Sequence, residues 1–207
     1  MIAYFMMDKA AAIAHLRNDP RLHAALDAVE IPDFSGNGQV YFSLLESIVS
    51  QQLSVKASDT IFKRFLALFP EGNPHADLLL KLETEQLRAV GLSYQKAGYL
   101  KNVAQFSLEN DLEGHDWSAM GDEEIIRFLT KIKGVGQWTV EMLLMFTLGR
   151  PDVLPVGDLG IQQGMANVCG LAETSRDLKK RMVEEAEIWR PWRTVACRYL
   201  WRWKDLG

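Results

Sequence analysis

The sequence predicts an all-α fold. Apolar residues recur at the spacing of one helix face, first at Leu44, Leu45, Ile48 and Val49. No stretch shows the sustained alternation of apolar and polar residues that marks a half-buried strand. Glycines and prolines interrupt the pattern often enough to leave helices of ordinary length between them.

The helical pattern continues along the chain in three further stretches. Asp122 is expected to cap the second of them, with Glu123 and Glu124 in its first turn. The apolar faces comprise Ala57, Ile61, Phe65 and Leu68, then Ile125, Ile126, Leu129 and Ile132, then Met142, Leu143 and Phe146. Breaks are expected at Pro32–Gly38, Pro70–Pro74, Gly91, Gly114, Gly134–Gly136, Gly149–Gly157 and Gly170.

Length and breaks together suggest two helical subdomains. A chain of 207 residues suffices for one large core or two small domains. The expected domain crossings are the segments 34–39 and 150–153, where glycine, proline and polar residues gather. We therefore predict a central bundle over 40–148 and a second subdomain built from 1–39 and 149–207.

Composition excludes several classes of protein. The 48% hydrophobic and 24% charged content is ordinary for a globular domain. No apolar run reaches the roughly 18 residues of a spanning helix, and the N-terminal stretch does not resemble a secretory signal. Cys169 and Cys197 offer neither a disulfide framework nor a cluster-binding spacing, and are expected to be buried free thiols.

Charge is unevenly distributed. A net charge of −4 argues mildly against nucleic-acid binding. The C-terminal part is nevertheless rich in cations, which would form either a basic binding face or an ordinary solvated helix surface. These residues are Arg176, Lys179, Lys180, Arg181, Arg190, Arg193, Arg198, Arg202 and Lys204.

The segment 129–139, LTKIKGVGQWT, predicts a helix, a tight turn and a second helix. Gly134 and Gly136 would let the backbone turn sharply and come close to a partner. Amides at the start of the second helix would point outward beside the positive end of the helix dipole, which suits an anion such as a phosphate. A plain turn without a ligand is the alternative.

With three other segments, this hairpin makes the chain resemble the helix-hairpin-helix DNA glycosylases, specifically the 3-methyladenine DNA glycosylase II branch. The resemblance implies two helical subdomains with an active-site cleft between them. The partner would be double-stranded DNA containing alkylated bases. The protein would act as a monomer and would not bind a membrane. Its location would be the cytoplasm, or the nucleoid of a bacterium. The matching segments are 47–54, SIVSQQLS; 91–101, GLSYQKAGYLK; the hairpin with 153–160, VLPVGDLG; and 189–196, WRPWRTVA.

Departures from the family pattern define the subtype. Trp138 stands where lyase-active relatives place a lysine, so no Schiff base can form there and a monofunctional enzyme is implied. The cysteine cluster of iron–sulfur members is absent, so no cofactor is required. The segment before residue 40 is short for the N-terminal β-domain of some relatives.

The resemblance implies that Asp158 is catalytic. Cleavage of the bond between base and deoxyribose builds positive charge on the sugar, which a carboxylate stabilises while it orients or deprotonates water. On spacing alone, Asp158 could equally be the N-cap of the helix that follows. The two roles are compatible, because a helix start favours an ionised carboxylate.

Other residues acquire DNA-binding roles by the same resemblance. Gln52, with Leu53 beside it, matches the residue that fills the gap left by a flipped nucleotide. Trp138 and Trp201 match pocket positions, where aromatic faces attract a cationic alkylated purine. For Gln52 the alternative is an ordinary capped turn, and for the two tryptophans it is packing in the core. Trp189 and Trp192 are expected to be core residues. Further DNA contacts are assigned to Gly134, Val135, Gly136, Thr139 and Lys96, and less strongly to Lys101, with solvated surface lysines as the alternative.

Family members can also hold a sodium or potassium ion at the hairpin through main-chain carbonyls. In this chain the carbonyls would be those of Thr130, Ile132 and Val135. Three other readings stay open at this stage. They are a DNA-binding module without activity, a glycosylase for a different damaged base, and a helical interaction protein.

Overall fold

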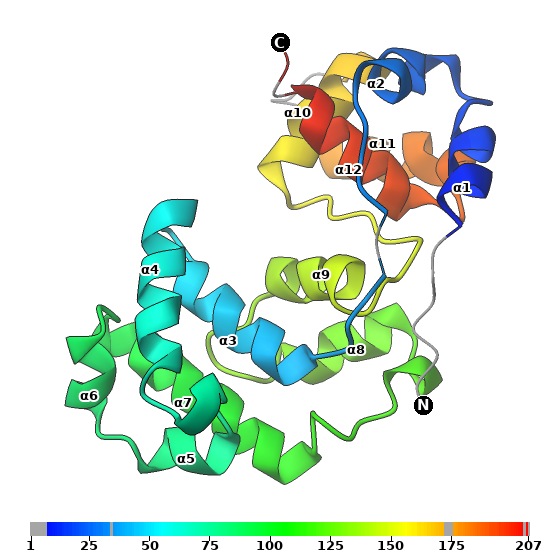
Figure 1. Cartoon of the computed structure of the whole chain (residues 1–207). Coiled ribbons are helices and arrows are strands. Elements are labelled where there is room, and N and C mark those ends of the chain that lie inside the picture. The colour runs from blue at the N-terminus through cyan, green and yellow to red at the C-terminus, as the bar shows by residue number, and fades with distance from the viewer. Residues whose placement is uncertain (1–7, 34, 172–175, 205, 207) are drawn as a thin grey trace. The chain divides into compact units, whose positions relative to one another are not determined.

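A computed structural model of the chain describes residues 8–33, 35–171, 176–204 and 206 (Figure 1). Every regular element in these ranges is an α-helix or a short 3₁₀ helix, which confirms the all-α prediction. Within the same ranges, each helix falls short of the length or apolarity that crossing a bilayer demands. Phe34, at the start of the first expected domain crossing, lies outside the described residues.

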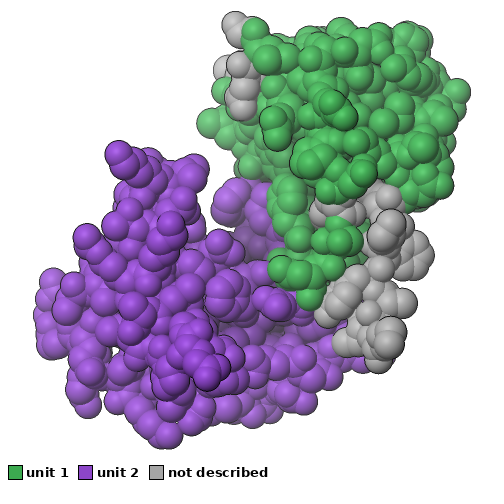
Figure 2. Space-filling view, in the orientation of Figure 1, with its two compact units in different colours: residues 1–37, 144–207 green, residues 38–143 purple. Residues whose placement is uncertain are grey.

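The chain divides into two compact units (Figure 2). Unit 1 combines residues 1–37 with 144–207, and unit 2 comprises residues 38–143. Helix α9, Gln137–Phe146, begins in unit 2 and ends in unit 1. Unit 1 is therefore built from both ends of the chain, so residues far apart in sequence form one core.

Unit 2 is organised around α3, whose predicted apolar residues Leu44, Leu45, Ile48 and Val49 are all fully buried. Helix α3 packs against α4 and α7, and α5 and α6 pack against α7. The elements are α3 Val40–Ser50, α4 Val55–Leu66, η2 Pro70–Gly72, α5 Ala76–Lys81, α6 Thr84–Ala89, α7 Tyr94–Asn110, η3 Trp117–Ala119 and α8 Asp122–Leu129.

Local signals explain where these helices start. Ser54 and Ser93 are N-caps whose hydroxyls accept hydrogen bonds from the main-chain N–H of Ala57 and Lys96. The expected N-cap of α8 was wrong by one residue. Gly121 caps the helix, and Asp122 lies in the first turn, where its charge still complements the helix dipole.

Unit 1 buries Trp189 completely. Helix α12 packs against α1, α2 and α10, and α10 also packs against α11. The elements are α1 Lys9–Leu16, η1 Pro20–Leu22, α2 His23–Ala28, α10 Leu159–Cys169, α11 Leu178–Glu185, η4 Ala186–Trp189 and α12 Arg193–Lys204.

A charged group lies inside this core. Asp19, only 3% exposed, accepts a hydrogen bond from the Trp189 indole N–H at 2.8 Å. Arg21 donates to both oxygens of Asp19 and also reaches Glu185. Burial alone would raise the pKa of the Asp19 carboxyl, but the donors Arg21 and Trp189 outweigh it, so the net pKa lies below its usual value. The network thus joins η1, η4 and α11.

We expect Asp19→Asn to lower the free energy of unfolding by about 3 kcal/mol at pH 7, because Arg21 loses its buried partner. A carboxyl with a lowered folded-state pKa stabilises the fold above its unfolded pKa, about 4, and this contribution disappears as pH falls through the folded-state pKa. Urea unfolding followed by circular dichroism should therefore show a difference between variant and wild type that shrinks at acidic pH. The exposed pair Arg17–Asp27 provides the control, since Asp27→Asn should cost at most about 1 kcal/mol. A difference that stays constant with pH would contradict the assigned role.

Candidate active site and nucleic-acid interface

Asp158 is the N-cap of α10. Its Oδ1 accepts a hydrogen bond from the main-chain N–H of Ile161 at 2.9 Å and a second from the indole N–H of Trp201 at 2.7 Å. The side chain is half-buried. The capping interpretation of Asp158 is therefore confirmed, and the carboxylate is oriented by donors from two helices, α10 and α12.

The loop that delivers Asp158 is fastened by the motif over 189–196. Arg193 donates to the Asp152 carboxylate at 2.7 Å and to the Asp152 main-chain oxygen at 2.7 Å. Thr194 accepts from the N–H of Val153 at 3.0 Å and donates to the main-chain oxygen of Arg150 at 2.7 Å. The motif therefore fixes the loop 150–153 through hydrogen bonds, a structural role that the sequence spacing did not indicate.

Trp201 owes its place beside Asp158 to a glycine. A Cβ atom on Gly160 would lie 2.8 Å from Cδ1 and 3.0 Å from Nε1 of Trp201, which is closer than packed atoms come. One helical turn later, a Cβ on Gly164 would lie 3.0 Å from the Cβ of Leu200. These two glycines let α10 and α12 approach closely. On its other side Trp201 stacks on Phe146, with ring centroids 5.8 Å apart.

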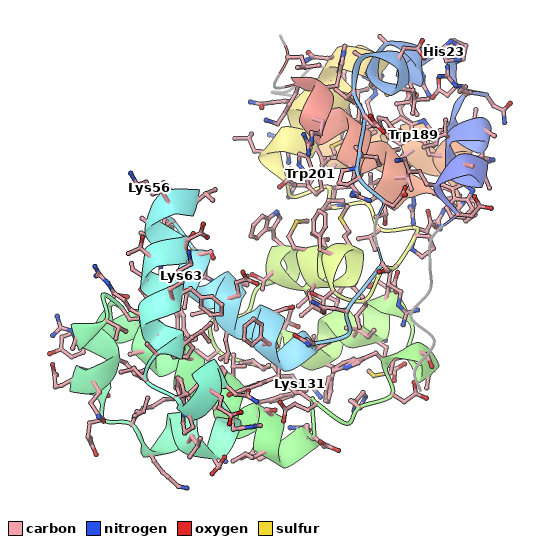
Figure 3. The ribbon with its side chains drawn as sticks, viewed as in Figure 1. His23, Lys56, Lys63, Lys131, Trp189 and Trp201 are labelled. Atoms are coloured by element: carbon pink, nitrogen blue, oxygen red, sulfur yellow. The ribbon has the colours of Figure 1, made fainter. Side chains whose placement is uncertain are left out.

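Trp201 also borders a cavity of about 310 Å³ in unit 1. Figure 3 shows the indole extending from α12. Aromatic, aliphatic and guanidinium groups share the wall. Burial, with a smaller contribution from nearby Arg202, holds the pKa of the Arg198 guanidinium below its usual value. The lining residues are Ile31, Pro32, Phe146, Arg198, Trp201 and Arg202.

The predicted hairpin is present as α8, a turn and α9, which confirms the helix–turn–helix prediction. Its two glycines have different surroundings. Gly134 has φ +108°, and a Cβ there would overlap the ring of Tyr99. Among the described residues, a Cβ on exposed Gly136 would meet no atom within 4 Å apart from its chain neighbours. The fold itself therefore requires glycine at 134, whereas no contact in the described part of the chain requires it at 136.

Some main-chain carbonyls of the hairpin accept hydrogen bonds from other groups of the protein. Ile132 O accepts from Val135 N at 3.0 Å, which leaves the second lone pair of that oxygen for another partner. The carbonyls of Lys133 and Gly134, outside the predicted cation-binding set, accept from the side chains of Asn102 and Gln51. The predicted cation ligands are the carbonyls of Thr130, Ile132 and Val135. They do not include the two carbonyls that accept hydrogen bonds from side chains.

The start of α9 places three residues differently. Trp138 is 47% exposed, so it is not a core residue. The side chains of Thr139 and Val135 are 5% exposed, so any DNA contact from them would have to come from the main chain. The first amides of a helix have no intrahelical acceptor, and here they belong to residues 137–139.

The turn between α3 and α4 projects its side chains outward. Gln52 is exposed and has φ +58°, a left-handed conformation that costs a non-glycine residue energy. Leu53, 39% exposed, follows it. Gln51 donates from Nε2 to Gly134 O at 3.3 Å, so the turn and the hairpin are linked within unit 2.

Lys96 holds this turn from inside. Its ammonium donates to the main-chain oxygens of Val49 and Gln51, each at 2.7 Å. Burial places the pKa of Lys96 below its usual value. A phosphate contact was predicted for this lysine; the structure gives two of its three donors to the protein main chain instead. Lys101 is half-buried.

The C-terminal basic residues do not form a uniformly available face. Arg190 and Arg193 both pair with Asp152, and Lys180 pairs with Glu184. By contrast, exposed Lys56 and Lys63 extend from α4, directly after the Gln52 turn (Figure 3). Neither lysine belongs to a motif of the sequence, so only their exposure on α4 makes them candidates for DNA contact.

The two cysteines and the potential metal ligands among the described residues do not form a second candidate site. Cys197 is buried and Cys169 half-buried, and both are free thiols. Burial raises the pKa of Cys169 to about 11, so its reactive thiolate is scarce at neutral pH. Among the residues that the structure describes, no three His, Cys, Asp or Glu side chains gather as a metal site.

The hairpin places the chain among the helix-hairpin-helix proteins. The model of the HhH-GPD superfamily of base excision DNA repair proteins matches residues 45–193. The chain belongs to this family, as its resemblance indicated.

Named relatives are similar over most of the chain. DNA-3-methyladenine glycosylase 1 of Schizosaccharomyces pombe is 36% identical over 169 residues, which cover 81% of this chain and 73% of that protein. The structure of an S. pombe 3-methyladenine DNA glycosylase in complex with abasic DNA matches with a TM-score of 0.79 at 34% identity, covering 93% of this chain and 95% of that one. A DNA-3-methyladenine glycosidase from Bacillus halodurans matches with a TM-score of 0.73 at 36% identity, covering 97% and 92%.

The two hairpin glycines should respond differently to alanine. Gly134→Ala should cost about 2–4 kcal/mol of unfolding free energy, because it combines an unfavourable φ with overlap of Tyr99. Gly136→Ala, on an open surface, should stay within about 1 kcal/mol of wild type. Guanidinium unfolding of both variants measures this, with Gly136→Ala as the matched control. Equal losses would show that the turn is not built as described.

Proposed function

We propose that this protein is a monofunctional DNA glycosylase of base excision repair. It hydrolyses the N-glycosidic bond of alkylated purines such as 3-methyladenine and 7-methylguanine in double-stranded DNA. Family membership and the 3-methyladenine glycosylases at 34–36% identity support this proposal. The single observation that carries the chemistry is the carboxylate of Asp158, oriented by Trp201, whose indole also lines a cavity.

In this proposal Asp158 stabilises the sugar as positive charge develops there during departure of the base. The same carboxylate orients or deprotonates the water that adds to the sugar carbon. The products are the free base and an abasic site. Trp138 supplies no amine, so the reaction ends at hydrolysis without strand cleavage.

DNA contacts are proposed for unit 2. The outward amides at the start of α9 bind a phosphate, and the open space at Gly136 admits its oxygens. Gln52, held outward by its left-handed backbone, fills the gap left by the flipped nucleotide, with Leu53 beside it. Lys56 and Lys63 add phosphate contacts on α4. Trp138 of unit 2 and Trp201 of unit 1 are each proposed, independently of the other, as an aromatic contact for a cationic base.

No cofactor is required for this reaction. We propose in addition that the carbonyls of Thr130, Ile132 and Val135 hold a sodium or potassium ion, which would support the phosphate contact of the hairpin. A single copy of the chain is sufficient, since one nucleotide leaves one duplex. The compartment would be the one that holds the DNA, the cytoplasm in a bacterium.

Asp158→Asn should slow release of 3-methyladenine about a hundredfold or more, because the charge that stabilises the sugar is lost. Asparagine is a good N-cap, so the start of α10 and duplex binding should survive. Chromatography of free base released from methylated DNA measures the rate, with spontaneous release subtracted, and anisotropy measures binding. Asp27→Asn, the same change on the surface of unit 1, should leave release unchanged. Normal release by Asp158→Asn would remove Asp158 from the mechanism.

Gln52→Gly should weaken capture of a duplex with a tetrahydrofuran abasic analogue about tenfold, a loss of about 1.4 kcal/mol. Glycine suits the backbone at φ +58°, so the turn persists and only the wedge side chain disappears. Anisotropy with the analogue and with an undamaged duplex separates gap filling from general binding. Leu53→Ala is the companion variant. An effect seen with Leu53→Ala alone would move the wedge to Leu53.

A second candidate is a glycosylase of the same family for a neutral damaged base. It is favoured by Arg198 and Arg202 in the cavity wall, because guanidinium groups repel a cationic purine and donate to carbonyl oxygens. Release of hypoxanthine and of 3-methyladenine, compared at equal enzyme, decides between the two. Release of neither base would leave a DNA-binding module without activity.

A further inference from the structure

We infer that Trp201 is a positioning residue for the reaction. Its indole N–H orients the Asp158 carboxylate, a task separate from offering an aromatic face to the base. The inference rests on the proposed role of Asp158. It concerns one hydrogen bond and the packing that maintains it.

The hydrogen bond couples two helices. Trp201 Nε1 donates to Asp158 Oδ1 at 2.7 Å, a short distance typical of a bond to a charged acceptor. The same oxygen accepts from Ile161 N at 2.9 Å. A single capping bond leaves the carboxyl plane free to rotate, whereas a second donor from α12 restricts that rotation.

The position of Trp201 is itself maintained from two sides. Phe146 stacks on one face of the indole, with an interplanar angle of 26°. Gly160 provides the clearance on the α10 side, since a Cβ there would lie within 3.0 Å of Nε1, the donor atom itself. Moving the indole away from residue 160 would therefore lengthen the bond to Asp158.

Orientation matters for this chemistry. A carboxylate that stabilises a developing sugar cation, or orients water toward it, loses effect when it rotates away. A fixed donor removes the need to reorganise during the reaction. Stacking alone makes a different prediction, because phenylalanine retains an aromatic face while it lacks the N–H.

The test compares Trp201→Phe with wild type in single-turnover release of 3-methyladenine over a range of enzyme concentrations. Loss of a hydrogen bond to a charged group predicts a maximal rate about tenfold or more lower. The concentration that gives half-maximal rate should be unchanged, because the aromatic face remains. Trp203→Phe, the same substitution on the same helix, is the control and should match wild type.

Gly160→Ala tests the same bond from the other helix. It should lower the maximal rate as Trp201→Phe does, because the added methyl displaces the indole. Gly164→Ala is the companion variant and should lower the maximal rate less, since a methyl there meets Leu200 and not the indole itself. Circular dichroism and duplex binding confirm that all four variants are folded.

The outcomes separate this inference from the proposed function. An unchanged maximal rate in Trp201→Phe, or a rise in the half-maximal concentration alone, overturns the positioning role and leaves stacking. If Asp158→Asn releases base normally, the proposed function of Asp158 fails first. A loss in Asp158→Asn with no loss in Trp201→Phe overturns the inference alone.

Discussion

The candidate site of unit 1 depends on the carboxylate of Asp158, whose Oδ1 accepts hydrogen bonds from two helices. Helix α10 contributes a main-chain amide and α12 contributes an indole, so the site exists only where those helices meet closely. Gly160 and Gly164 allow that approach, because any side chain there would displace Trp201 or Leu200. The stability of this helix pair and the geometry of the site thus have the same origin.

The motif over 189–196 supports the same carboxylate from a distance. Arg193 and Thr194 secure the loop that leads to Asp158, while Trp189 reaches back to buried Asp19 near the N-terminus. This network joins both ends of the chain within unit 1, and leaving it half-satisfied would be costly. Arg190 and Arg193 of this motif both form ion pairs with Asp152. The motif therefore has less unpaired positive charge than a count of its residues suggests.

Unit 2 shows that residues of one type can answer different constraints. Gly134 is required by the protein, through its positive φ and the Tyr99 ring, whereas Gly136 faces open space. Likewise Lys96 donates hydrogen bonds to main-chain oxygens of the turn that contains Gln52, while Lys56 and Lys63 on α4 are exposed. An acidic protein can therefore present cations and amides locally, and its net charge is a weak guide to its partners.

The sequence by itself determined the helical class, the hairpin and the buried face of α3, because these follow from local periodicity and glycine spacing. It also determined family membership, through four motifs in order. Tertiary structure alone decided that Trp201 donates to Asp158, that Lys96 donates to main-chain oxygens, and that Asp152 pairs with two arginines. These partners lie more than 35 residues apart, as the separation of 43 between Asp158 and Trp201 illustrates. Periodicity gives the face a side chain occupies on its own helix, but the atom it meets is set by how the helices pack.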